Sequence, residues 1–362
     1  MKKLLGFLLS LSMTCAAIPC VSSCGKSDSN DQDNTQQIQN VILVIGDGMG
    51  ENHILNALKY FDLETPDFMD DLQSYIGTNS LSGTTDSAAG GTALATGVKT
   101  TNGSVAQLGG EDLEQITAIA QAAGMKTGVI TTDTLDGATP ATFSAHASNR
   151  GAIGQIINTQ AVSNIDLMMG RWSSDYTNRS TVFTQQNYTL LTDEAELLET
   201  QKDQKLVGLF ANIDSKYILG NESDFQLSAM TEFAINHLEN ENGFFLMIEG
   251  AYIDKHSHSN RLYEAMSETR SLIDTIEYLY EYASDGKTAI FITADHETGG
   301  LKKATTEELD NTLYSCGDHT PTPVPLYIKN YSLDIQDFGY EGDVTPENTI
   351  VFEACKSIIN NK

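Results

Sequence analysis

Basic residues are scarce in this chain. Its 362 residues include 21 lysines and arginines against 49 aspartates and glutamates, which gives a formal net charge of −28. Binding to a nucleic-acid backbone depends on a surplus of cationic side chains, so this composition excludes nucleic acid as an expected partner. A small anionic substrate would also be repelled at long range, unless bound cations reverse the sign of the charge at its site.

Cysteine is also sparse, which excludes a small scaffold held together by disulfides. Three of the five cysteines, Cys15, Cys20 and Cys24, lie close to the N-terminus. The other two, Cys316 and Cys355, could pair in an oxidising compartment or remain free thiols, because their spacing does not show whether their Cβ atoms meet.

One apolar stretch at the N-terminus has the character of a targeting segment. Leu4–Ile18 is mostly apolar and follows Lys2 and Lys3, as in an export signal. It is too short and too interrupted to span a bilayer as a helix. The sequence Val-Ser-Ser-Cys-Gly at 21–25 is similar to a bacterial lipobox.

These N-terminal patterns predict an exported lipoprotein. We expect residues 1–23 to be the signal peptide and Cys24 to be the lipidated first residue of the mature chain, with Cys15 and Cys20 as alternatives. Residues 24–40 form a polar stretch that we expect to be a disordered tether. The protein would then be periplasmic or attached to the outer membrane, and would contact the membrane only through its lipid anchor.

The rest of the chain shows the alternation of an α/β fold. Apolar runs typical of strands buried on both faces of a parallel sheet occur at 41–45, 127–131, 206–210, 244–248, 289–293 and 325–328. Helical spacing is found at 113–123, 228–238 and 263–282. We therefore predict a three-layer sandwich with a large, mainly parallel central sheet flanked by helices. No linker composition divides residues 41–362, so we expect one domain, with an irregular excursion at 171–205.

Acidic residues follow three of the predicted strands. Asp47 comes after the strand at 41–45, Glu249 directly after 244–248, and Asp295 after 289–293. Ligands of open α/β sheets bind beyond the carboxyl ends of the strands. We therefore expect these carboxylates to face a ligand at one edge of the sheet.

Histidines accompany two of these strand ends. His256 and His258 lie close to Asp254, and His296 follows Asp295 directly. Imidazole and carboxylate together are the ligand mixture of zinc sites that carry out hydrolysis. Either His256 or His258 could point away from such a site. The isolated histidines His53 and His237 are more typical of a surface or of a hydrogen-bonded core.

A serine lies where a helix is expected to begin. Ser87 follows Asp86 and precedes a run of Ala, Gly and Thr residues. The first backbone N–H groups of a helix have no partner inside the helix and favour a nearby anion. The same pattern is common at ordinary helix N-caps, so Ser87 is a candidate nucleophile only in combination with the metal-ligand residues.

Taken together, these motifs resemble the alkaline phosphatases of bacteria and animals. They occur in the family's order and extend over nearly all of the predicted domain. The matching strings are Ile-Gly-Asp-Gly-Met-Gly at 45–50, Thr-Asp-Ser-Ala-Ala at 85–89, Thr-Gly-Val-Lys-Thr at 96–100, Ala-Thr-Pro-Ala at 138–141 with His146 and Arg150, Glu-Gly-Ala at 249–251 with Asp254 and His258, Thr-Ala-Asp-His at 293–296, and His-Thr at 319–320.

The resemblance implies a catalytic domain at 41–362 with three metal sites. One Zn²⁺ would be bound by Asp254, His258 and His319. A second Zn²⁺ would be bound by Asp47, Asp295 and His296, and would contact the nucleophile Ser87. A third ion, Mg²⁺, would be bound by Asp47, Thr139 and Glu249. Arg150 would bind phosphate directly, and Lys255 would reach it through water.

The activity that the resemblance implies is hydrolysis of phosphate monoesters through a phosphoserine intermediate on Ser87. The substrates would be small phosphorylated molecules, and a homodimer is one possible assembly. The short segment at 299–318 lacks the insertion of some relatives, which would leave the pocket open and give it broad specificity.

The chain departs from the family pattern at one position near the third metal. Two residues before Thr139, many relatives carry Asp or His, but this chain has Gly137, preceded by Asp136. Either Asp136 substitutes through a shifted loop, or the third site is weaker or more hydrated than in those relatives.

Two other functions remain open. The first is a phosphodiesterase or sulfatase of the same superfamily, although Arg150 disfavours a diester and no sulfatase modification motif surrounds Ser87. The second is a non-catalytic surface lipoprotein that binds phosphorylated ligands or glycans. The presence of every expected zinc ligand and of the serine disfavours this second alternative.

Overall fold

The computed structural model describes residues 37–221, 225–306, 309–342 and 344–362. These described residues form one compact unit. The expected signal peptide, the lipidation site at Cys24 and most of the expected tether lie outside the described residues. None of the described helices is both long enough and apolar enough to cross a bilayer.

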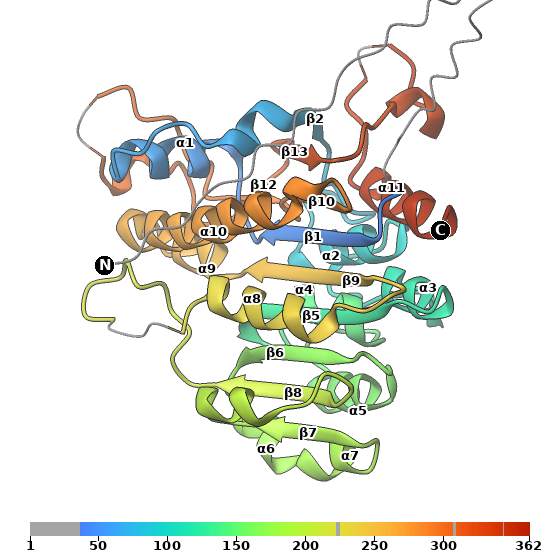
Figure 1. The fold of residues 1–362 in the computed structure, drawn as a ribbon. Coiled ribbons are helices and arrows are strands. Elements are labelled where there is room, and N and C mark those ends of the chain that lie inside the picture. Colours follow the sequence, from blue (N-terminus) through green and yellow to red (C-terminus); the bar gives the residue numbers. More distant parts are fainter. Residues whose placement is uncertain (1–36, 222–224, 307–308, 343) are drawn as a thin grey trace, which may run out of the picture. The chain divides into compact units, whose positions relative to one another are not determined.

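A nine-stranded sheet forms the middle layer, in the order β2-β13-β10-β1-β9-β5-β6-β8-β7 (Figure 1). The strands from β10 to β7 in this order are parallel, and β13 is antiparallel to both of its neighbours. The predicted large, mainly parallel sheet is therefore confirmed. The strands are β1 (Asn40–Gly46), β2 (Leu72–Ile76), β5 (Lys126–Thr134), β6 (Leu167–Arg171), β7 (Tyr188–Leu191), β8 (Lys205–Phe210), β9 (Phe244–Gly250), β10 (Thr288–Thr293) and β13 (Val324–Lys329).

The middle of the sheet is buried on both faces. Every residue of β1, β9 and β10 is buried. This burial explains why these strands appear in the sequence as unbroken apolar runs, because helices cover both sides of the sheet and no position faces water.

Helices form the two outer layers, as predicted. On one face lie α1 (Glu51–Tyr60), α8 (Leu227–Leu238), α9 (Tyr252–His258) and α10 (Leu262–Tyr282) (Figure 1). On the other face lie α2 (Ser87–Thr96), α3 (Ile116–Ala122), α4 (Ala138–Ser144), α5 (Ile153–Val162) and α11 (Thr349–Asn360).

The expectation of an irregular excursion at 171–205 is wrong. This stretch contains two short helices, α6 (Ser174–Asn178) and α7 (Ser180–Thr184), and the edge strand β7. Helices α6 and α7 pack against α5, and α7 also packs against β7. A helix of five residues makes little more than one turn, so it shows no helical periodicity in the sequence.

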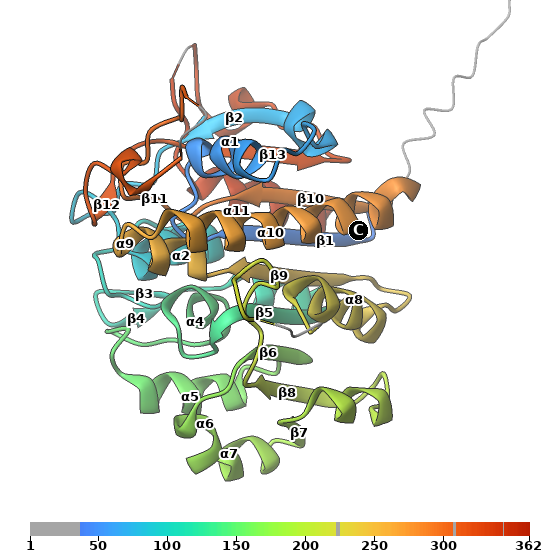
Figure 2. The same ribbon diagram turned by 90° about the vertical axis from the view of Figure 1, so that its left-hand side faces the viewer.

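Two small strand pairs complete the fold. One joins β3 (Gln107–Leu108) and β4 (Glu111–Asp112), and the other joins β11 (Glu297–Thr298) and β12 (His319–Thr320). Figure 2 shows β11, β12, α9 and the cyan helix α2 at the same end of the fold. This end carries the residues that the sequence motifs single out.

Candidate active site

The sheet order brings three acidic strand ends together. Strand β1 lies between β9 and β10, and Ile45 of β1 is level with Glu249 of β9 and with Thr293 of β10. Asp47 directly follows β1, and Asp295 follows β10 by two residues. The carboxylates therefore meet at one edge, as the strand pattern predicts.

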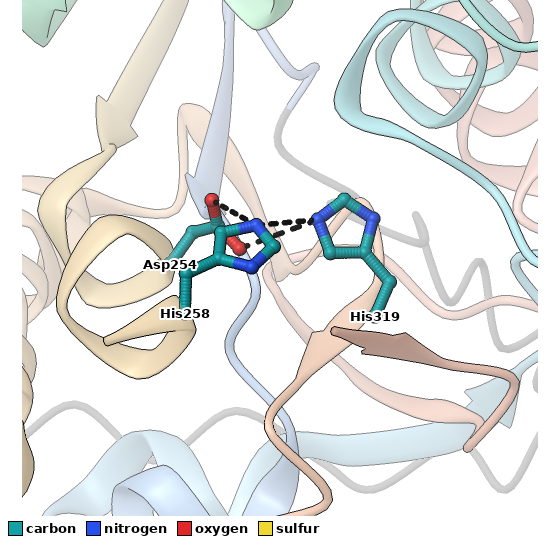
Figure 3. Close-up of side chains that lie close together, drawn as sticks. All are labelled: Asp254, His258 and His319. Atoms are coloured by element: carbon teal, nitrogen blue, oxygen red, sulfur yellow. Dashed lines mark hydrogen bonds and ion pairs between the residues drawn. The ribbon is translucent and has the colours of Figure 1, made fainter. Parts of the chain in front are cut away.

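A first cluster consists of Asp254 and His258, one turn apart on α9, and His319 at the start of β12 (Figure 3). Oδ2 of Asp254 lies 3.4 Å from Nε2 of His258, and Oδ1 of Asp254 lies 3.5 Å from Nε2 of His319. The two Nε2 atoms lie 3.0 Å apart. Three ligand atoms thus face one small space.

The outer nitrogens of these two rings fix their tautomers. Nδ1 of His258 lies 2.7 Å from the carbonyl oxygen of Gly317, and Nδ1 of His319 lies 2.8 Å from that of Thr85. A carbonyl oxygen only accepts, so each Nδ1 carries a proton and donates it. Two Nε2 lone pairs would then face each other, which requires a cation between them. A second ring nitrogen bonded to a carbonyl is also the usual arrangement of histidines that bind metals.

The electrostatics of this cluster favour positive charge on the two imidazoles, since the pKa values of His258 and His319 are both raised. The hydrogen bond to Asp254 outweighs burial and raises the pKa of His258 to about 9. Burial disfavours the ionised form of Asp254, but the hydrogen bonds from His258 and His319 outweigh it and hold the pKa of Asp254 well below its usual value.

A second cluster is centred on His296. Its Nε2 atom lies 3.4 Å from Oδ1 of Asp47, 3.3 Å from Oδ2 of Asp295 and 3.3 Å from Oγ of Ser87. All four side chains are at least nine-tenths buried. The candidate nucleophile therefore lies among the carboxylates and the imidazole that the sequence assigns to the second zinc.

Thr298 connects the two clusters, and sequence reasoning missed it. Its hydroxyl donates to Oδ1 of Asp254 at 2.5 Å and lies 3.2 Å from Nδ1 of His296, from which it accepts. The lone pair on Nε2 of His296 therefore faces Ser87 and the carboxylates. The only sequence signal for Thr298 is its position two residues after His296.

Gly48 lies against Thr298 and Asp254, at a position where only glycine fits. Its φ is +71°, and a Cβ there would lie 2.7 Å from the Thr298 hydroxyl and 2.9 Å from Oδ1 of Asp254. Both the backbone conformation and the space thus exclude a side chain. The glycine in the Asp-Gly-Met-Gly string after β1 therefore allows the backbone next to Asp47 to lie close to Asp254 of α9 and Thr298 of β11.

Three of the predicted metal ligands each have a buried side-chain oxygen without a hydrogen-bond partner. These oxygens are Oδ1 of Asp47, Oδ2 of Asp295 and Oγ1 of Thr139. A buried oxygen without a donor is costly, so such atoms are rare unless they bind an ion or water. The residues present therefore fit divalent cations.

The charges of the site lead to the same conclusion. Burial, followed by the nearby Asp295, Asp254 and Glu249, raises the pKa of Asp47 well above its usual value. Burial and the charge of Asp133 raise the pKa of Glu249 to about 8. Carboxylates this close ionise together only when cations compensate them.

Arg150 lies beside the start of α2. Asp86 is the N-cap of this helix, where its Oδ1 accepts from the backbone N–H of Ala89, and Ser87 is the first helical residue. The Arg150 guanidinium lies 3.3 Å from the second oxygen of Asp86 and is partly exposed. Arg150 thus contacts the residue that precedes Ser87, and its guanidinium is accessible to a ligand from solvent.

Lys255 is more than a surface charge. Its ammonium forms an ion pair with Asp133 and lies 4.5 Å from the centre of the Tyr252 ring. Burial opposes its charge, but Asp133 outweighs burial and raises the pKa of Lys255 above its usual value.

The remaining candidate residues lie outside the two clusters. His256 faces Tyr252, with ring centres 5.7 Å apart. His53 and His237 are core histidines, hydrogen-bonded to Ser257 and to the carbonyl of Gln204 respectively. Cys316 and Cys355 are both free thiols.

This combination defines a class of α/β proteins in which a buried serine faces clustered metal ligands at the carboxyl edge of a parallel sheet. The family model described as alkaline phosphatase matches residues 38–169 and 166–356. The chain belongs to the alkaline phosphatase family.

Two curated relatives are alkaline phosphatases 4 and 3 of Bacillus subtilis (strain 168). The first is 35% identical over 301 residues, which is 76% of this chain and 65% of the relative. The second is 30% identical over 293 residues, which is 74% of this chain and 63% of the relative. The chain therefore spans slightly less than two thirds of the length of these proteins.

Solved structures give a more complete match. The alkaline phosphatase from the Antarctic bacterium TAB5 is 30% identical, with a TM-score of 0.77, and the match covers 90% of this chain and 100% of that chain. A TAB5 variant with one histidine changed to glutamate is described with Mg bound in the M3 site, and matches at 29% identity, a TM-score of 0.76, and 90% and 98% coverage.

Proposed function

We propose that this protein hydrolyses phosphate monoesters of broad leaving-group range through a phosphoserine intermediate on Ser87. The observation that carries the proposal is the position of Oγ of Ser87, 3.3 Å from Nε2 of His296 and among buried carboxylates. Membership of the alkaline phosphatase family supports it.

The donor sets indicate which metals the site would hold. Asp254, His258 and His319 would bind one Zn²⁺, and Asp47, Asp295 and His296 the other, because mixed imidazole and carboxylate ligands suit zinc. Asp47, Thr139 and Glu249 offer only oxygen, which suits Mg²⁺. When bound, these ions would favour the ionised forms of serine and water and neutralise charge on the phosphate oxygens.

Ser87 would act twice in the reaction. Its hydroxyl first loses a proton to solvent. Oγ then attacks phosphorus, the bond from phosphorus to the alcohol oxygen breaks, and the departing alkoxide takes a proton from water, which leaves hydroxide. Hydroxide attacks the phosphoserine, the bond from phosphorus to Oγ breaks, and hydrogen phosphate is released together with the Ser87 alkoxide. The position of Ser87 in the first turn of α2 places free backbone N–H groups beside the transferred group.

Arg150 would orient the phosphoryl group. A guanidinium presents two parallel N–H donors that match two oxygens of a phosphate, and Asp86 holds this guanidinium beside the helix start. A diester has one fewer free oxygen for these donors, so Arg150 favours a monoester. With the metal ions, Arg150 makes the pocket locally cationic on a chain of charge −28.

A comparison of three p-nitrophenyl compounds tests this function. We expect rapid release of p-nitrophenol from the phosphate monoester and at least about 100-fold slower release from bis(p-nitrophenyl) phosphate and p-nitrophenyl sulfate. Ser87→Ala should lower monoester turnover by about 10³-fold or more, because the covalent step is removed. Preference for the diester or the sulfate, or a Ser87→Ala variant with nearly unchanged turnover, would contradict the proposal.

We also propose that the protein is exported and anchored through a lipid on Cys24. The lipobox-like sequence at 21–25 supports this proposal. Metabolic labelling with a fatty acid should label the wild-type chain and leave Cys24→Ser unlabelled. Equal labelling of both chains would contradict it.

A further inference from the structure

The carboxylate of Asp133 lies beside Gly137. The family pattern has a side chain at position 137 that this chain lacks. A Cβ built on Gly137 would lie 2.6 Å from Oδ2 of Asp133 and 2.9 Å from the carbonyl oxygen of Thr134. Asp133 thus occupies the space that a side chain at position 137 would fill. The two side chains exclude each other.

Asp133 belongs to the surroundings of Glu249. It lies near the end of β5, the strand that pairs with β9, and Thr131 of β5 is level with Glu249. The Thr131 hydroxyl donates to Glu249, and the backbone N–H of Asp133 donates to that hydroxyl at 2.8 Å. After burial, Asp133 is the strongest influence that raises the pKa of Glu249.

Two unsatisfied oxygens indicate that a ligand belongs at this position. Oγ1 of Thr139, only 1% exposed, and Oδ1 of Asp47, at 6%, have no hydrogen-bond partner. Both residues belong to the oxygen set proposed for the third metal. Because Thr139 is not an acid, its orphan hydroxyl is an observation independent of the carboxylate cluster.

The adjacent acid, Asp136, lies near the buried hydroxyl of Tyr176 in α6, and its charge acts with burial to raise the pKa of Tyr176. Its Oδ1 atom is also buried without a hydrogen-bond partner. Of the two acids in the loop, Asp133 is the one that is joined to Glu249 through Thr131.

We infer that Asp133 supplies the carboxylate that Gly137 cannot, and completes a Mg²⁺ site with Glu249, Thr139 and Asp47. Mg²⁺ retains several waters in protein sites, so Asp133 can act directly or through one of them. Lys255 holds one oxygen of Asp133 and compensates part of the excess negative charge. The inference rests on the third metal site of the proposed function.

A carboxylate swap between positions 133 and 137 tests this assignment. Mg²⁺ alone is titrated into the zinc-loaded protein by calorimetry, and bound Mg and Zn are counted by elemental analysis. Asp133→Ala and the isosteric Asp133→Asn should each weaken Mg²⁺ binding by about 10- to 100-fold. The double variant Asp133→Ala with Gly137→Asp should restore part of the affinity, because removal of Asp133 relieves the shorter of the two close contacts at 137, and the contact with the Thr134 carbonyl oxygen needs only a small backbone shift. Gly137→Asp alone should not raise it, because the new side chain collides with Asp133.

Asp136→Asn is the matched control and should bind Mg²⁺ as the wild type does. Unchanged zinc content shows that each variant keeps its fold and its other sites. Wild-type affinity in both Asp133 variants, loss of affinity in Asp136→Asn, or failure of the zinc-loaded wild type to bind Mg²⁺ would each overturn the inference. Hydrolysis is measured separately, so a protein that binds Mg²⁺ through Asp133 but does not hydrolyse monoesters would refute only the proposed function.

Discussion

Oγ of Ser87 lies 3.3 Å from Nε2 of His296, although 209 positions separate these residues in the chain. Ser87 is the first residue of a buried helix on one face of the sheet, and His296 follows the central strand β10. The contact exists because parallel strands end at the same edge, where the loops and helix starts that follow them meet. The site therefore depends on the strand order of the sheet as well as on the residues of the motifs.

Helix α9 offers a matched pair of histidines for the first metal site. His258→Gln should lose one zinc per chain, or bind it at least about 100-fold more weakly, because its Nε2 atom faces Asp254 and His319. His256→Gln should keep full zinc content, because His256 faces Tyr252. Elemental analysis after dialysis against a zinc buffer measures both. Equal zinc loss in the two variants would show that the effect comes from the helix and not from His258.

Thr298 should raise the zinc affinity of the site, although it does not bind zinc itself. Thr298→Val keeps the shape but removes the hydroxyl shared by Asp254 and His296. We expect zinc affinity to fall by about 10- to 100-fold, as for other groups that orient metal ligands. Thr298→Ser keeps the hydroxyl and should remain near wild type. Competition with a chromogenic zinc chelator measures the affinities, and equal affinities for the Val and Ser variants would contradict this role.

Gly48→Ala should damage both stability and metal binding. An alanine pays about 1–2 kcal/mol for the left-handed backbone and also collides with Thr298 and Asp254. Gly109→Ala is the control, because Gly109 has a similar φ of +63° but open space around it. Denaturant unfolding should show a larger loss for Gly48→Ala than for Gly109→Ala, and only Gly48→Ala should lose zinc. Identical losses would mean that the close approach at Gly48 has no consequence.

Zinc binding should release protons near neutral pH. In the metal-free site the hydrogen bond to Asp254 raises the pKa of His258 to about 9, so this ring is protonated at pH 7, whereas a zinc ligand must be neutral. Zinc affinity should therefore rise with pH, by about tenfold per unit between pH 7 and pH 9 for this one group, and level off above. Calorimetry in buffers of different ionisation enthalpy counts the released protons. Zinc binding without proton release at pH 7 would contradict the assignment of His258.

Much of the fold can be predicted from the sequence, because strands that are buried on both faces consist of unbroken apolar runs. Strands β1, β9 and β10 are buried at every position and appear as unbroken apolar runs. The edge strands β2 and β7 expose part of their surface and are short, so no such run marks them. Their place in the sheet depends on tertiary pairing, which the local sequence does not encode.

The candidate site shows a similar division. The motifs identify the residues that the structure gathers at the edge, because carboxylate and imidazole at strand ends are chemically distinctive. Thr298 has no such signal. Asp133 does follow the predicted strand at 127–131 by two residues, but it lies outside the family motifs. Asp133 meets Lys255 across 122 positions of the chain, and such a contact becomes visible only once the fold brings the end of β5 to Lys255 of α9.

Anomalous scattering at the zinc edge, recorded from crystals of the folded part of the chain, tests the central claim most directly. The account predicts two peaks about 4 Å apart. One should lie among Asp254, His258 and His319, and the other should lie within bonding distance of His296 and next to Oγ of Ser87. A single peak, or zinc bound away from Ser87, would contradict it.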